Sequence, residues 1–279
     1  QILASNVGGT ATLIGDPPNI MIGSAAHLSF MDFLENTGFA VLFILVVLIL
    51  LMKIVYEKKI ELGTVDTGAI EKLDPSKSIT NRALMKKGII VLICVIVGFM
   101  FHDKLGIESS VIALTAAAVM LIIGREDVNE AIQDVEWTTI LFFMSLFVVV
   151  GGLTETGIIN ELASKIIDAT NGHPMVTMLV LLWASALLSS ILDNIPFVAT
   201  LIPLILAMQA DGIDVTSFWW AISLGACLGG NGTMIGASAN VVLSDISTKH
   251  GYPITFKSYL KVGMPFMLLS IVIATVFLV

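Results

Sequence analysis

The sequence has little charge and little cysteine. Only 13% of its 279 residues are charged, whereas about 25% is usual in soluble domains. The two cysteines, Cys94 and Cys227, stand in separate apolar runs, without the spacing of a disulfide framework or a metal site. Basic residues do not alternate with aromatics, so nucleic acid is not an expected partner. No GxSxG, HExxH or P-loop pattern occurs in a supporting context. The sequence therefore predicts neither an enzyme nor a cofactor.

The sequence is instead rich in long apolar runs. Apolar residues make up 56% of the chain, and the mean hydropathy is +0.96. Apolar runs long enough to cross roughly 30 Å of hydrocarbon recur throughout. They predict an all-α integral membrane protein with the lipid bilayer as its surroundings. The expected uninterrupted spans are residues 39–56, 88–101, 110–124, 138–151 and 262–279, and the expected amphipathic helices are residues 125–136 and 160–170.

Two further apolar stretches are interrupted. Residues 174–210 contain Asp-Asn-Ile-Pro at 193–196, and residues 217–247 contain Gly-Gly-Asn-Gly at 229–232. At membrane depth, irregular backbone is tolerated only where it is buried in protein or lines a watery cavity. The first stretch therefore predicts a re-entrant hairpin, and the second predicts a broken helix.

The basic residues predict which loops face the cytoplasm. The polar segment 57–87 holds the largest group of Lys and Arg, and we interpret it as a cytoplasmic linker. Alternating the spans from there puts 12 of the 14 basic residues on the cytoplasmic side. This layout predicts a multi-pass protein of the plasma (inner) membrane, with the C-terminus outside.

An internal repeat is the most informative feature of the sequence. The pattern GGxxTxIGxxxN occurs at residues 8–19 and again at residues 229–240. Because the first copy leads outward and the second inward, the two predict an inverted-topology repeat, as in many secondary transporters. Residues 1–56 are then the end of the first repeat. Residues 88–279 are the second repeat, with scaffold spans in 88–151. The first repeat is expected to be incomplete, by roughly 130 residues if both repeats have equal length.

The repeated motif predicts a binding site at the helix breaks. Glycines let a helix unwind, freed carbonyls can coordinate a cation, and the helix that restarts points its N–H groups toward an anion. The motif supplies two kinds of candidate residue. The glycines are Gly8, Gly9, Gly230 and Gly232, and the neutral oxygen ligands are Thr10, Thr12, Asn19, Asn231, Thr233 and Asn240. Such ligands suit Na⁺ or an uncharged hydroxylated solute, and helix ends suit an oxyanion. The alternative is that these glycines serve close helix packing.

Three polar residues stand in apolar surroundings. Asp193 and Asn194 lie at the expected hairpin tip, where an ionisable group is a functional candidate by default. Asp16 lies in the first break, and the repeat gives it Ala237 as its partner. Either carboxylate could bind Na⁺ or carry a proton. The alternative for both is an N-cap. Na⁺ could bind at Asp193, Asn194 and Asn231, and no other metal is expected.

At these residues the chain resembles the group of arsenite permeases, NhaD-like antiporters and pink-eyed-dilution P proteins in the ion transporter superfamily. Residues 5–19, 192–200 and 225–242 carry the resemblance. It implies a scaffold domain that forms a homodimer and a transport domain that moves as an elevator. It also implies a site made from the hairpin tip and both breaks. The matching positions are Asp193, Asn194 and Thr200 in the hairpin, and Asn6, Gly8, Gly9, Thr10, Thr12, Gly230, Asn231, Gly232 and Thr233 in the breaks.

The function predicted from these features is secondary transport of a small inorganic solute, arsenite-like or an oxyanion, coupled to H⁺ or Na⁺. Three alternatives stand beside it. They are Na⁺/H⁺ exchange, citrate or dicarboxylate uptake, and a non-transporting membrane subunit that needs a partner. Polyanion uptake is the weaker of the transport alternatives, because no Lys or Arg stands near the middle of an apolar span to pair with the substrate.

Overall fold

The computed structural model describes residues 1–57, 79, 81–125, 127–135 and 137–279, and every regular element in them is a helix. By length and composition, three helices could cross a membrane: Phe30–Tyr56, Arg82–Leu105 and Phe256–Leu278. The pair Ile140–Glu155 and Ile158–Ala169, bent by 70°, makes a fourth if it is counted as one span. The predicted all-α membrane class is confirmed. The chain divides into two compact units, one of residues 1–50 with 140–279 and one of residues 51–139.

The smaller unit contains α6 (Arg82–Leu105), α7 (Ser109–Gly124) and α8 (Val128–Gln133). Helix α6 begins six residues earlier than the span expected from residue 88, because the Asn81 side chain accepts the Leu84 N–H at 3.0 Å and caps it. Gly106, in the left-handed region, ends it. Most of the expected linker 57–87 lies outside the described residues. The amphipathic segment expected at 125–136 has its helix at α8.

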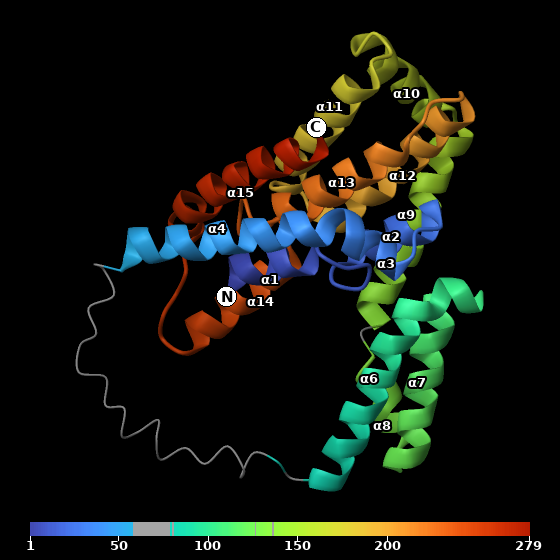
Figure 1. Ribbon diagram of the computed structural model, residues 1–279. Coiled ribbons are helices and arrows are strands. Elements are labelled where there is room, and N and C mark those ends of the chain that lie inside the picture. The colour runs from blue at the N-terminus through green and yellow to red at the C-terminus, as the bar shows by residue number, and fades with distance from the viewer. Residues whose placement is uncertain (58–78, 80, 126, 136) are drawn as a thin grey trace. The chain divides into compact units, whose positions relative to one another are not determined.

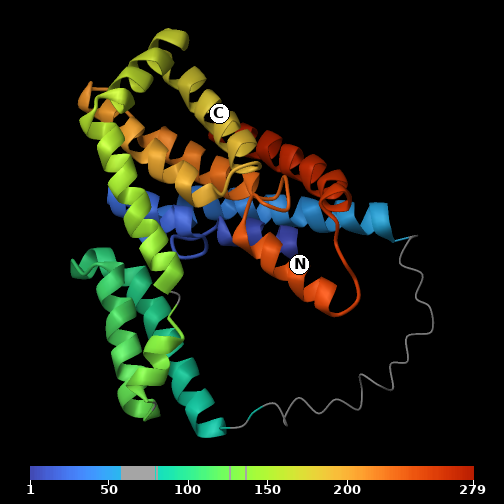
Figure 2. The same ribbon diagram turned by 180° about the vertical axis from the view of Figure 1, so that it is seen from behind.

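The larger unit is built around α13 (Thr216–Gly229), which Figures 1 and 2 show in its middle. Every residue of Phe218–Gly229 is buried. Small residues allow this close packing: a Cβ on Gly229 would lie 2.5 Å from the Ala186 carbonyl oxygen. The neighbours of α13 are α1 (Ile2–Gly9), α2 (Pro17–Ala26), α11 (Pro174–Ser189), α12 (Asn194–Ala210) and α15 (Phe256–Leu278).

The remaining helices lie at the outside of this unit. Helix α4 (Phe39–Tyr56) lies beside α15, where Phe39 and Phe43 contact the ring of Phe277 (Figure 1). Helices α9 (Trp137–Glu155) and α10 (Ile158–Ala169) form the bent pair, and α10 packs on α12. A short helix α3 (Phe30–Phe33) and a π-helical turn η1 (Leu34–Gly38) lead into α4.

All the expected interruptions occur as breaks between helices. Residues 10–16 separate α1 from α2, residues 190–193 separate α11 from α12, and residues 230–237 separate α13 from α14 (Ser238–Lys249). Both repeat copies then continue into a long apolar helix that has its own irregularity. The first has the π-turn η1, and the second has Pro265 inside α15.

Candidate functional site

The two helix breaks are built alike from glycine contacts. A Cβ added to Gly15 would lie 2.2 Å from the Gly9 carbonyl oxygen. At the equivalent place in the second copy, a Cβ on Gly236 would lie 2.7 Å from the Gly230 carbonyl oxygen. Both distances are shorter than any real Cβ contact, and both partners are backbone. Glycine is therefore required at both ends of each break, because the chain passes over itself there.

Asn19 and Asn240, the last residues of the two motif copies, hold the breaks in shape. Each side chain is fully buried and donates two hydrogen bonds to carbonyl oxygens of its own break. The acceptors are Thr10 (3.3 Å) and Thr12 (3.0 Å) for Asn19, and Gly230 (2.7 Å) and Thr233 (2.8 Å) for Asn240. Carbonyls that a continuous helix would satisfy are thus paired with a side-chain amide instead.

Buried side chains also join the two broken helices to each other. The Asn6 amide of α1 donates to the Asn240 side-chain oxygen of α14 at 2.8 Å and to that of Asn231 at 3.0 Å. In return, the Ser223 hydroxyl of α13 donates to the Asn19 side-chain oxygen of α2 at 2.7 Å. The first half of each broken helix therefore bonds the second half of the other. A local two-fold axis would produce this reciprocal pattern.

A polar cavity of about 120 Å³ lies where the breaks meet. Part of its lining comes from α1, including Ser5 and Asn6. The rest comes from the N-terminal ends of α2, α12 and α14, which contribute Asp16, Asn194 and Ser238. Three helix N-termini thus converge on one small space. Each carries the partial positive charge of a helix N-terminus, which favours an anion.

Asp16 and Asn194 face each other across this cavity. The Asn194 amide nitrogen lies 3.4 Å from both carboxylate oxygens of Asp16. Among the described residues, no backbone N–H of α2 donates to that carboxylate, because Pro17 and Pro18 have none to offer. Asp193 behaves differently: its carboxylate accepts the Ile195 N–H at 3.3 Å and caps α12. The geometry thus gives Asp193 a capping bond and puts Asp16 on the cavity.

The other predicted site residues fall into three groups. Asn6 and Gly9 line the cavity with Asp16 and Asn194. The remaining motif residues form the shell that shapes the breaks: Thr10, Thr12, Asn19, Gly230, Asn231, Gly232, Thr233 and Asn240. Two residues lie apart from these groups. Gly8 is exposed, and Thr200 donates within its own helix to the Phe197 carbonyl at 2.7 Å.

The expected Na⁺ ligands include one whose side chain is already used. Both ends of the Asn231 amide are engaged, since its oxygen accepts from Asn6 and its nitrogen donates to the Leu3 carbonyl at 3.3 Å. Within the described ranges, His, Cys, Asp and Glu form no group of three or more that could hold a metal ion. A sodium site at these residues stays a prediction.

Sequence reasoning missed two polar contacts near the breaks. Ser223 bonds Asn19 as described above, and the buried Thr37 hydroxyl donates to the Thr10 carbonyl at 3.1 Å. Neither residue belongs to the repeated motif. A usable signal was present for Thr37, which follows a capping box at Ser29 and stands near the start of a long apolar run. For Ser223 the sequence carries no comparable signal.

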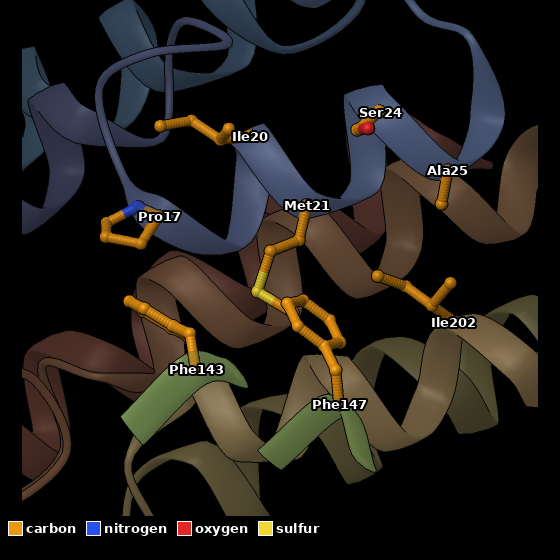
Figure 3. Close-up of a pocket in the computed structure, with 8 residues that line it drawn as sticks. All are labelled: Pro17, Ile20, Met21, Ser24, Ala25, Phe143, Phe147 and Ile202. Atoms are coloured by element: carbon orange, nitrogen blue, oxygen red, sulfur yellow. The ribbon is translucent and has the colours of Figure 1, made fainter. Parts of the chain in front are cut away.

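A second pocket is apolar. It measures about 470 Å³ and lies between α2, α9 and α12. Figure 3 shows the Met21 side chain of α2 reaching Phe147 of α9, with Phe143 on the Pro17 side and Ile202 on the other. Ser24 supplies the one hydroxyl among its described lining residues, and Pro17 borders this pocket and the polar cavity alike. Its lining suits hydrocarbon better than an ion.

Comparison with known proteins places these features in a family. The family model described as "Citrate transporter" (CitMHS) matches residues 1–225. A 46 kDa membrane protein of Mycobacterium leprae is 37% identical over 281 residues, which cover 100% of this chain and 66% of that protein. An uncharacterised transporter of Synechocystis is 31% identical, with 99% of this chain and 66% of that protein covered. The mouse P protein is 30% identical over 100% of this chain and 43% of its own length.

The resemblance drawn from the motifs is confirmed by these matches. The chain spans about two thirds of the length of the bacterial relatives. Its apolar helices and the family model together make it an integral membrane protein. This chain belongs to the citrate transporter family of the ion transporter superfamily.

Proposed function

We propose that this protein is a secondary transporter of a small inorganic solute, arsenite-like or an oxyanion, and that the solute binds in the cavity between the two helix breaks. The observation that carries the proposal is the convergence of three helix N-termini on one polar cavity. Its volume of about 120 Å³ corresponds to roughly four water molecules in the liquid. That size suits a solute of a few heavy atoms.

The inverted repeat predicted from the sequence would suit transport by alternating access. The two broken helices exchange hydrogen bonds reciprocally, as halves related by a two-fold axis would. The basic residues predict that the second break leads to the cytoplasmic side, and residues 27–38 after the first break contain no Lys or Arg. Such breaks near the bilayer midplane, at a repeat interface, are where secondary transporters hold their substrates. The proposed topology has the 57–87 segment inside and the C-terminus outside.

The division into two compact units fits a transporter with a mobile transport domain and a fixed scaffold domain. The larger unit holds the cavity, and the smaller one holds the helix pair α6 and α7, which are largely exposed along their apolar faces. We assign the larger unit to substrate transport and the smaller one to a scaffold that pairs in a homodimer. The coupling ion is H⁺ or Na⁺.

Citrate is the second candidate solute, because the family model bears that description. Three helix N-termini could hold carboxylates. However, no Lys or Arg occurs among the described residues that line the cavity, and Asp16 adds a negative charge there. A trianion would therefore meet repulsion from Asp16 and no cationic side chain. These charges favour the smaller solute.

The test is uptake by proteoliposomes that contain the protein at its full natural length. Arsenite, inorganic phosphate and citrate are offered in turn, each with an imposed proton or sodium gradient. We expect uptake of arsenite or phosphate that collapses with one of the gradients. A sodium-evoked pH change without solute flux would instead indicate Na⁺/H⁺ exchange and remove the proposal. Silence with every solute and ion would favour the non-transporting subunit.

A matched pair of variants tests the place of binding. Asn194→Ala removes an amide from the cavity, and we expect uptake to fall by at least about tenfold. Asn160→Ala changes the same residue type on the exposed side of α10 and should leave uptake unchanged. Equal uptake by both variants would move the solute away from this cavity.

A further inference from the structure

We infer that Asp16 is the proton carrier of the transporter, and that its protonation and the binding of an anionic solute in the shared cavity depend on each other. This rests on the proposed function and deepens it, since it assigns the coupling to one side chain. When the site fills, the carboxylate takes one proton and becomes a neutral carboxylic acid. When the site empties, it returns that proton to water.

The first support is that the Asp16 carboxylate has no part in building its helix. Asp127 and Asp214 stand at helix starts too, and each accepts a backbone N–H two residues on. Asp16 occupies the N-cap position of α2 but makes no such bond, because prolines fill the next two positions. A carboxylate that lies in an apolar segment and does not cap its helix is a candidate for a functional role.

The second support is the equivalent position in the other break. Asp16 has φ −144° and ψ 137°, and Ala237 has φ −153° and ψ 147°. Both residues therefore hold the same extended backbone at the start of the restarted helix. Since Ala237 supports that geometry with a methyl group, the break does not require a carboxylate. The Asp16 carboxylate is therefore a group that the first break has and the shared backbone geometry does not need.

The third support is the set of groups around Asp16. The Asn194 amide, 3.4 Å away, and the ends of three helices all present positive partial charge. This surrounding favours an anion. A solute anion in the same cavity would meet the Asp16 carboxylate at close range. Protonation of Asp16 relieves that repulsion, so proton and anion bind together.

Two other titratable groups act on Asp16, and neither replaces it. Asp193 on α12 is engaged as the cap of its helix, and its charge adds to the cost of a second anion nearby. Cys227 on α13 is fully buried, and its thiol donates to the Asn19 side-chain oxygen at 3.4 Å. The described residues of α1 and the first turn of α14 present no ionisable side chain to the cavity. Asp16 is thus the group whose protonation changes the charge of the cavity wall.

The test measures protons taken up when the anion binds. Inorganic phosphate and citrate are added to the purified full-length protein in weakly buffered detergent, with a pH-sensitive dye. We expect wild-type protein to take up about one proton per anion more than the Asp16→Asn variant does. On the alkaline side, the anion affinity of the wild type should fall with pH about tenfold more per pH unit than the affinity of Asp16→Asn does. The solute's own protonation cancels in this difference.

Matched variants keep the result decisive. Asp16→Glu keeps a carboxyl group and should restore the proton uptake. Asp214→Asn makes the same chemical change at an exposed position just before α13 and should match the wild type. The Asp214 carboxylate stays charged near neutral pH, because the backbone and side chain of Thr216 donate to it and lower its pKa. A folded Asp16→Asn protein is recognised by an unchanged elution volume and a melting temperature no lower than that of the wild type.

Three outcomes would overturn the inference. The first is equal proton uptake by Asp16→Asn and wild type, with anion uptake intact, which leaves the proposed function standing. The second is loss of proton uptake in Asp193→Asn but not in Asp16→Asn, which moves the carrier to Asp193. The third is an anion affinity that rises with Na⁺ concentration, together with anion binding that takes up no proton. Failure of the wild type to bind or transport any anion would instead remove the proposed function, and this inference with it.

Discussion

The two helix breaks have one architecture and two chemistries. Residues 10–16 and 230–237 share the close glycine contact, the Asn that closes the break and the extended residue before the restarted helix. They differ in that residue, which is Asp16 in the first break and Ala237 in the second. Features that both copies keep are those that unwinding a helix inside a protein requires. The feature that one copy alone carries is where a specific function is to be sought.

The largest expected effect comes from filling the glycine contacts. Gly15→Ala places a methyl group on the Gly9 carbonyl, and Gly236→Ala places one on the Gly230 carbonyl. Both neighbours are backbone and cannot swing aside, so each variant should lose about 3 kcal/mol of stability. The loss should be greater for Gly15→Ala, where the contact is shorter. Thermal unfolding in detergent, followed by the fluorescence of the buried Trp219 and Trp220, measures both.

Gly8→Ala is the matched control. Among the described residues, no atom would come within 4 Å of its new methyl group apart from the helix itself. It should be neutral or slightly stabilising, since alanine favours a helix over glycine. If Gly236→Ala had the same melting temperature as this control while Gly15→Ala melted lower, the two breaks would not share an architecture.

These glycines also show what the sequence could predict. The repeated motif located both breaks, because the requirement for glycine and for a closing Asn is local and leaves a fixed spacing. It could not locate the bond from Asn6 to Asn240, which joins residues 234 positions apart and depends on packing. The same limit applies to Ser223. The division into two compact units was likewise not visible in the spacing of apolar runs.

The two aspartates show a subtler limit. From hydropathy alone, Asp193 and Asp16 are equivalent candidates, each at a break in an apolar stretch. The difference lies in the donors that follow them. Ile195 offers Asp193 an N–H, whereas Pro17 and Pro18 offer Asp16 none. That difference is present in the sequence, and hydropathy does not register it.

The next effect in size concerns the closing Asn residues. Asn240→Ala removes two bonds to break carbonyls and the acceptor of one Asn6 N–H, and Asn19→Ala removes two bonds to break carbonyls and the acceptor of the Ser223 hydroxyl. Burial of unpaired polar groups should cost about 2–3 kcal/mol in each case. Melting curves of both variants test whether the copies are equivalent. A loss below about 0.5 kcal/mol in one of them would show that water replaces its amide.

A smaller effect is expected where the first break meets the helix that follows it. The Thr37 hydroxyl donates to the Thr10 carbonyl at 3.1 Å, while Gly263 lies against the Asn231 carbonyl in the second copy. Thr37→Val keeps the shape and removes the bond, so it should cost about 1 kcal/mol. Thr248→Val is the control, because its hydroxyl bonds only within its own helix among the described residues. Equal melting temperatures for both would mean that the Thr37 bond adds nothing to the first break.

The smallest effect separates the two aspartates directly. Asp193→Ala removes a helix cap and should lose about 0.5–1 kcal/mol, whereas Asp193→Asn keeps a capping oxygen and should change stability by a few tenths. Asp16→Ala removes no cap, so it should not follow that pattern: its alanine and asparagine variants should be equally stable, or more stable than the wild type where a buried charge is lost. Melting temperatures of the four variants measure this contrast. If Asp16→Ala alone were destabilised and Asp16→Asn were not, the Asp16 oxygen would be supporting the backbone after all. The charge that distinguishes the first break from the second would then be a structural requirement and no longer a sign of function.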